Sequence, residues 1–217
     1  MYSSLVPVTD IVLNHRVLEK ANSLFEAWTN GSPLQPNLRT VVYRAAIRTS
    51  PAKAVEALKK EWYSGSSIDG KDLCLSSLGH TREPELIRQH LLPFLFNSSP
   101  PAPASESVPS VDMHTLGGSL AANLVARPLL WQYIQDNWAQ ATAKMSNPVV
   151  LDRFVKSTLG KFTDAKYIAE IDAFFAGQDT SAFDRTLLQV KDAVRGRAAY
   201  RARDATAIRE WLSANGY

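Results

Sequence analysis

Two side chains near the amino terminus have the spacing of a metal-binding pair. His15 and Glu19 are four residues apart, so on a helix they would lie on one face and could share a metal ion. Zinc sites use at least three protein ligands, and the neighbouring sequence supplies no third one. A solvated pair on a helix surface is therefore the favoured interpretation, and we assign no metal ligand.

The side chains that could act as nucleophiles lack activating surroundings. Cys74 is flanked by Leu73 and Leu75 in a predicted helix, which favours a buried, inert thiol. No G-x-S-x-G elbow occurs. Gly117 and Gly118 follow no strand and have no P-loop lysine, so close packing between helices explains them better than phosphate binding. We therefore predict no catalytic residue and no activity from the chain alone.

Arginines are dense near the carboxyl terminus: Arg195, Arg197, Arg201, Arg203 and Arg209, interspersed with Asp192, Asp204 and Glu210. The favoured interpretation is a solvated helix face with local ion pairs. Arg197 and Arg201, one helical turn apart, could alternatively hold a carboxylate such as the end of a peptide, or contact another domain. A nucleic-acid site would need a broader patch with interleaved aromatic residues, and Tyr200 alone does not provide one.

The composition is that of a folded protein rather than a disordered or membrane-spanning one. The chain has 217 residues, 45% of them hydrophobic and 21% charged, with a net charge of +3, which is enough apolar content for a sizeable core. The longest apolar run, 91–96, is too short to span a bilayer. A single cysteine suits a reducing compartment, and residues 1–16 do not resemble a signal peptide. We expect a cytoplasmic protein.

Helical periodicity dominates the first half of the chain, and no segment alternates as a strand would. Helices are expected over about 16–28, from 37, and over about 51–62, 71–78 and 83–92. Gly31 should end the first of them, and Gly79 should cap the fourth in the left-handed conformation. Pro93 should bend or stop the last one.

Residues 97–110 are rich in proline and serine. Such a segment has little apolar surface, so we expect an inserted loop. A proline-rich ligand for another domain is the alternative, but no aromatic or basic flanking residues specify recognition.

Helical patterns resume after this loop, over about 111–122, 127–145, 148–162 and 165–176. From 181 onward we expect either two helices that meet near Arg203-Asp204 or one long bent helix. The fold class is therefore all-α, as one domain of helices 14–96, the 97–110 loop and helices 111–217. The five tryptophans fall on apolar helix faces and should serve packing: Trp28, Trp62, Trp131, Trp138 and Trp211.

Several short motifs occur in one order at consistent spacing. The most specific is the stretch 114–123, HTLGGSLAAN, which is followed by RPLLW at 127–131 and NW at 137–138. FEAW at 25–28, DGKDLCL at 69–75 and REWL at 209–212 extend the pattern. Together they resemble the helical C-terminal region of zinc aminopeptidases of the aminopeptidase N type, in particular the fungal cytosolic branch.

The resemblance implies antiparallel helix pairs stacked as an α-α superhelix of the armadillo or HEAT kind, truncated at its N-terminal end. A strict sequence repeat is absent, so the superhelix depends on the resemblance. In such relatives this region closes as a bowl over a thermolysin-like zinc domain and can contact the distal end of a peptide. Arg39, Arg127 and Arg153 lie in matching motifs and, with Arg197 and Arg201, are candidates for peptide contact. Bracing of helices is the favoured alternative for the motif arginines.

The chemistry of those enzymes needs H-E-x-x-H and a further glutamate, and neither these elements nor the glycine-rich exopeptidase motif occurs in this chain. No cofactor is therefore expected here, and zinc is expected only in a catalytic domain outside this chain. The resemblance implies a non-catalytic domain that encloses the peptide-access cavity. The alternative is a stand-alone helical-repeat module that holds a peptide or protein partner. Expected partners are peptides or an aminopeptidase catalytic domain, not nucleic acid or membrane.

Overall fold

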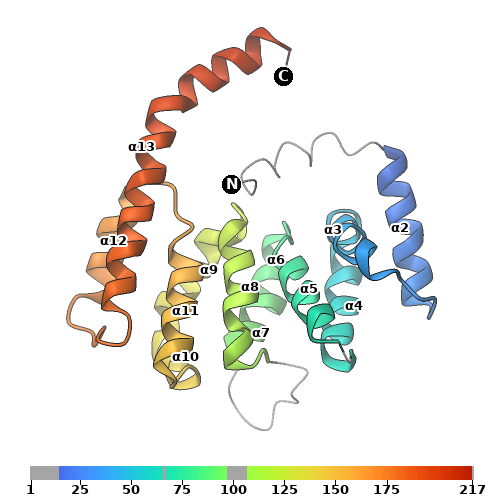
Figure 1. Ribbon diagram of the computed structural model, residues 1–217, viewed down its shortest axis with the longest axis horizontal. Helices are drawn as coiled ribbons and strands as arrows, with labels where there is room; N and C mark the ends of the chain where they lie inside the picture. The colour runs from blue at the N-terminus through green and yellow to red at the C-terminus, as the bar shows by residue number, and fades with distance from the viewer. Residues whose placement is uncertain (1–14, 66, 97–106, 217) are drawn as a thin grey trace.

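The computed structural model describes residues 15–65, 67–96 and 107–216, and all regular structure in these ranges is helical. The expected all-α fold class is thus confirmed. The helices follow one another across the molecule in chain order (Figure 1). The first part contains α2 (His15–Thr29), the 3₁₀-helix Pro36–Leu38, α3 (Arg39–Thr49), α4 (Pro51–Ser64) and α5 (Ile68–Leu78).

The central and final parts continue the row. They contain α6 (Pro84–Leu86), the π-helix Ile87–Leu91, α7 (Leu92–Phe96), the 3₁₀-helix Ser110–Asp112, α8 (Met113–Ala122), α9 (Ala126–Asp136), α10 (Trp138–Lys144), α11 (Pro148–Leu159), α12 (Lys166–Phe175) and α13 (Asp184–Ala214).

Most successive helices run in opposite directions, whereas α6, the π-helix and α7 are continuous. In Figure 1, α3, α5, α8 and α11 end at the top of the row, and we call this the upper edge, marked by Ser50, Gly79, Asn123 and Gly160. The opposite, lower edge holds the ends of α4, α7 and α10. Short turns between antiparallel neighbours match the sequence expectation, whereas the superhelix stays a prediction.

One continuous hydrophobic core runs through the row. Aromatic rings connect neighbouring helices, as in the edge-to-face pairs Trp62–Phe94, with ring centroids 5.3 Å apart, and Phe96–Phe154, at 5.9 Å. Such pairs contribute beyond their burial. Val108, at the end of the predicted loop, is also buried, and its N–H donates to the Phe94 carbonyl at 2.8 Å. Residues 97–106 of that loop lie outside the described ranges.

The adjacent glycines of α8 allow it to pack closely against α11. A Cβ added at Gly117 would lie 2.8 Å from Phe154 Cε2 and 3.0 Å from Thr158 Cγ2. One added at Gly118 would lie 3.3 Å from Ser157 Cβ. Side chains at these positions would force the helices apart, so the predicted packing role is confirmed.

Gly79 ends α5 by a different mechanism from the predicted one. Its φ is −64° rather than positive, so the expected left-handed cap is wrong. The reason for a glycine is the close approach of α8, because an added Cβ would lie 2.2 Å from Ser119 Oγ. Gly31, with φ 95°, does adopt the left-handed conformation expected at the end of α2.

Pro93 does not stop its helix. The chain continues through α7 to Phe96, after one π-helical stretch over Ile87–Leu91. A proline removes one N–H and its ring clashes with the carbonyl four residues earlier, and a wider π turn accommodates this defect. The predicted 127–145 helix is also interrupted, because Asn137 separates α9 from α10.

The final segment is one helix of 31 residues, which confirms the long-helix alternative. Its C-terminal half projects beyond the other helices (Figure 1), and no described residue after Val194 is buried. Trp211 is 61% exposed, so its predicted packing role is wrong, whereas Trp62 and Trp131 are buried as expected. No helix in the described ranges has the length and apolar character needed to cross a membrane.

Candidate functional site

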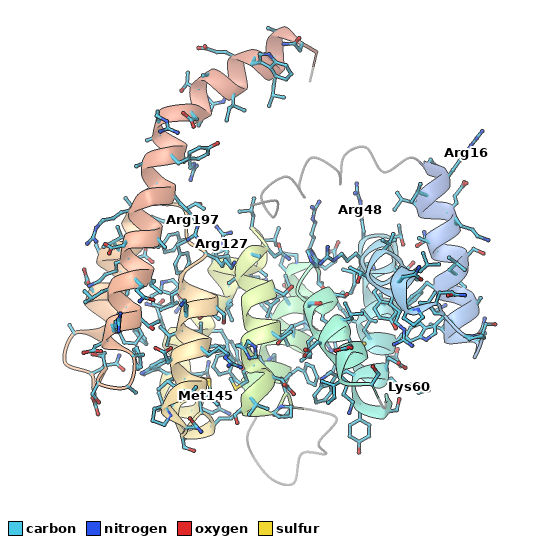
Figure 2. All side chains as sticks on the ribbon, in the orientation of Figure 1. Arg16, Arg48, Lys60, Arg127, Met145 and Arg197 are labelled. Carbon is cyan, nitrogen blue, oxygen red and sulfur yellow. The ribbon has the colours of Figure 1, made fainter. Side chains whose placement is uncertain are left out.

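The five candidate arginines do not converge on one site. Arg127 and Arg197 lie near each other at the upper edge (Figure 2), and Arg201 follows Arg197 by one turn of α13. Arg39 begins α3, and Arg153 lies exposed on α11. Figure 2 places Lys60, which lines the same pocket as Arg39, at the lower edge, opposite Arg127 and Arg197. A single peptide-contact surface formed by all five is therefore not observed.

Arg127 binds the end of α8. Its Nε donates to the Ala121 carbonyl at 2.6 Å, while its terminal nitrogens approach the Ala122 carbonyl at 3.4 Å and Thr163 Oγ1 at 3.5 Å. A cation there complements the negative end of the helix dipole. Burial lowers the pKa of Arg127; the charge of Arg197 also lowers it, and Tyr167 opposes the shift. These contacts support the bracing interpretation.

The other two upper-edge arginines also make local interactions. Arg197 Nη1 donates to the Gly160 carbonyl, at the end of α11. Arg201 Nη1 lies 4.0 Å from Asp164 Oδ2, and both side chains are largely exposed. This arrangement agrees with the solvated face with ion pairs that the sequence favoured.

Arg39 differs from the other candidates because it faces a pocket. This cavity of about 570 Å³ lies between the α2–α3 connection and α4, and its walls include Trp28, Leu34 and Glu61. The Arg39 side chain is partly buried, and its Nε is buried with no hydrogen-bond partner. Gly70 provides room for the guanidinium, because an added Cβ would lie 3.0 Å from Arg39 Nη1.

The next turn of α3 carries a buried hydroxyl. Tyr43 is fully buried one turn after Arg39 on α3, and its hydroxyl has no hydrogen-bond partner. Burial raises the pKa of Tyr43, the charges of Cys74 and Glu61 raise it further, and Arg39 opposes them. Tyr43 is therefore coupled electrostatically to both charged walls of the pocket.

Cys74 itself is fully buried. Burial raises the pKa of its thiol to about 12, with a further contribution from Glu61 that Arg39 opposes. The thiol is protonated near neutral pH and has no exposed face, so it is a poor nucleophile. The predicted buried position of Cys74 is confirmed.

The described residues offer no ligand set that fits zinc. His15 Nδ1 lies 3.0 Å from Glu19 Oε1, with side chains 88% and 66% exposed, as expected of a solvated pair. No group of three or more histidine, cysteine, aspartate or glutamate side chains gathers in a metal-binding arrangement in the ranges described. No reaction step through a metal is therefore derived for these residues.

Comparison with known proteins assigns the helical row to a family. The model of the ERAP1-like C-terminal domain matches residues 11–196, most of the chain. The chain belongs to the ERAP1-like C-terminal domain family. The matched range ends two residues after Val194, the last buried residue described in this ERAP1-like domain.

The relatives are aminopeptidases. Similar proteins include "Aminopeptidase 2, mitochondrial" of Saccharomyces cerevisiae, 26% identical over 83% of this chain and 18% of the relative. Rice Aminopeptidase M1-B is 28% identical over 75% of this chain and 18% of its own length. Human Glutamyl aminopeptidase is 25% identical over 92% of this chain and 20% of its own length. The ERAP1-like domain thus spans about a fifth of the length of these relatives, and the resemblance in the sequence is confirmed.

Sequence reasoning singled out Arg39 but missed its surroundings. The pocket combines Trp28 from α2, Arg39 from α3 and Glu61 from α4. No linear motif connects residues from three helices. The one available signal is the Arg39–Tyr43 spacing, which places both residues on the same face of α3.

Proposed function

We propose that this chain is the non-catalytic C-terminal helical domain of a zinc aminopeptidase-like protein. In this proposal it encloses the peptide-access cavity of a catalytic domain outside the chain. The observation that carries the proposal is the family match over residues 11–196, combined with relatives that are named aminopeptidases and are about five times longer. Peptides and the catalytic domain are its proposed partners.

The projecting half of α13 supports contact with another domain. Its large apolar side chains include Tyr200, which is 58% exposed, and Ile208, which is 48% exposed. Leu212 and Trp211 lie one turn beyond Ile208 and are also exposed. Apolar side chains gathered on one projecting segment are typical of a surface that another protein covers.

A reconstitution experiment tests this proposal. The catalytic part of yeast Aminopeptidase 2, prepared without its own helical domain, would be mixed with this chain, and trimming of long peptides measured. We expect restored trimming with this chain and none with the chain alone. Ile208→Ser should weaken the restoration, whereas Val149→Ser, at a position 67% exposed on α11, should not.

The alternative is a stand-alone module that holds a peptide or protein. The pocket at Arg39 favours it, because binding there needs no second domain. Failure of the mixture to associate, together with peptide binding by the chain itself, would support this alternative. Release of amino acids by the chain alone, with zinc bound in equal amount, would contradict both functions.

A reducing intracellular compartment, the cytoplasm, is the proposed location. Its support is the single, buried cysteine, which has no partner for an internal disulfide.

A further inference from the structure

The pocket at Arg39 presents charges of both signs that do not neutralise each other. Arg39 and Glu61 line the cavity with Glu56 and Lys60, no ion pair between described residues joins Arg39 to Glu61, and the Arg39 Nε lacks a hydrogen-bond partner. Lys53 on the same wall differs, because it pairs with Glu26. Opposite charges that face one cavity without touching leave a gap, which a molecule carrying both charges can fill.

The Arg39 guanidinium also points to an acceptor-bearing ligand. Arg39 lines the cavity, and its Nε is buried and lacks a hydrogen-bond partner. Buried polar groups are nearly always paired, so this exception calls for a partner near the guanidinium. A carboxylate offers two oxygens with several acceptor sites, and a guanidinium binds it in a planar, bidentate geometry.

The remaining walls set the size of the ligand. Trp28, Leu34 and Ala57 provide an apolar side to the cavity, and Leu34 is only 7% exposed. A volume of about 570 Å³ falls in the range of small-molecule sites, and the combination of apolar walls with few polar groups is typical of them. An amino acid or a dipeptide fits this space.

We propose that this pocket binds a small zwitterion, a free amino acid or dipeptide, whose carboxylate lies on Arg39 and whose ammonium group lies on Glu61. The ligand's apolar side chain packs against Trp28 and Leu34. Binding itself does not depend on the proposed function. If that function holds as well, the pocket senses the products that an aminopeptidase releases.

The test uses the full chain and four related ligands. L-leucine, leucyl-leucine, leucinamide and N-acetyl-leucine are titrated separately, with calorimetry and tryptophan fluorescence as readouts. Leucine and leucyl-leucine should bind with a dissociation constant on the order of 0.1–1 mM. Leucinamide lacks the carboxylate and N-acetyl-leucine lacks the ammonium group, so each should bind about tenfold more weakly.

Variants that remove one charge show which residue binds the carboxylate of the ligand and which binds its ammonium group. Arg39→Gln should bind leucine no better than leucinamide, and Glu61→Gln should bind leucine no better than N-acetyl-leucine. Arg153→Gln is the matched control, because Arg153 lies exposed on α11 and does not line the pocket. The urea midpoint of each variant reports whether it is folded, and either pocket variant alone suffices if the other fails to fold.

Two results would overturn the proposal. One is the absence of leucine and leucyl-leucine binding up to about 10 mM. The other is leucine binding by folded Arg39→Gln or Glu61→Gln that equals binding by Arg153→Gln. Reconstitution of peptide trimming is scored separately, so leucine binding without reconstitution would contradict only the proposed function.

Discussion

Gly79 lies directly against Ser119. A Cβ at position 79 would be 2.4 Å from Ser119 Cβ and 2.7 Å from the Ser119 carbonyl carbon. The second of these atoms belongs to the backbone of α8, so a rotamer change cannot relieve the overlap. The same approach lets Ser119 Oγ donate to the Ser76 carbonyl at 2.5 Å. This contact joins α5 to α8 at the middle of the row.

Gly79→Ala should therefore destabilise the protein. We expect the free energy of unfolding to fall by about 1–3 kcal/mol, the usual cost of overpacking a close contact. Urea unfolding followed by circular dichroism measures it. Gly196→Ala is the control: an added Cβ there meets nothing within 4 Å, so stability should rise by about 0.5–1 kcal/mol. Equal effects at both positions would contradict the packing argument.

Asn123 should be a second stabilising position at the upper edge. Its Nδ2 donates to the carbonyls of Gly79 at 3.0 Å and Thr81 at 2.6 Å, while its Oδ1 accepts from the Val125 N–H at 3.0 Å. Asn123→Ala leaves these groups without partners and should cost about 1–3 kcal/mol of unfolding free energy. Asn215→Ala removes one exposed bond to the Trp211 carbonyl and should change the thermal midpoint little. A thermal midpoint for Asn123→Ala as high as that of Asn215→Ala would argue against the bridge.

Substitutions of Arg127 and Arg153 distinguish a role in bracing helices from a role in peptide contact. Arg127→Gln loses charged hydrogen bonds to the end of α8 and should lower the unfolding free energy by about 1–3 kcal/mol. Arg153 is exposed, so Arg153→Gln should stay within about 0.5 kcal/mol of the unmodified protein. Chemical denaturation of both variants makes the comparison. An unchanged midpoint for Arg127→Gln would favour a ligand-binding role instead.

Lys144 should make stability depend on pH. Burial lowers the pKa of its amine from 10.5 to about 8. Between these pKa values the unfolded chain binds more protons at Lys144 than the folded chain does. The free energy of unfolding therefore increases as the pH rises. Lys144→Met should lack this increase in the free energy of unfolding. Urea midpoints measured between about pH 7.5 and 9 test the difference.

Cys74 has the opposite effect on the pH dependence of stability, and this limits the pH range over which Lys144 can be tested. The raised pKa of its thiol, about 12, means that the unfolded thiol ionises first as pH increases from about 9. Stability should then decline. The comparison therefore depends on the difference between Lys144→Met and the unmodified protein, and parallel pH curves for the two would refute the assignment.

Local periodicity predicted most helices because apolar stripes at helical spacing persist wherever a helix packs on one side. Gly117 and Gly118 were assigned to packing because two missing Cβ atoms inside a helix have few other uses. Gly31, with φ 95°, ends its helix as the sequence predicted.

The remaining features depend on tertiary structure. Nothing local to Gly79 distinguishes a left-handed cap from a glycine required by Ser119, which is distant in sequence. The π turn before Pro93 depends on the burial of Leu91 and Leu92, which keeps the helix from ending. The pocket at Arg39 combines residues from three helices, so its charge pattern exists only in the folded chain.

The length of α13 has a mechanical consequence. At 1.5 Å per residue, the part from Arg197 to the end of the helix forms an arm about 25 Å long. Arg197, at the base of this arm, donates to the Gly160 carbonyl. A tilt of about 10° there would displace the tip by about 4 Å. Small changes in the tilt of α13 would thus become large displacements of Trp211. The arm would thereby transmit movements between this domain and a protein surface that contacts its tip.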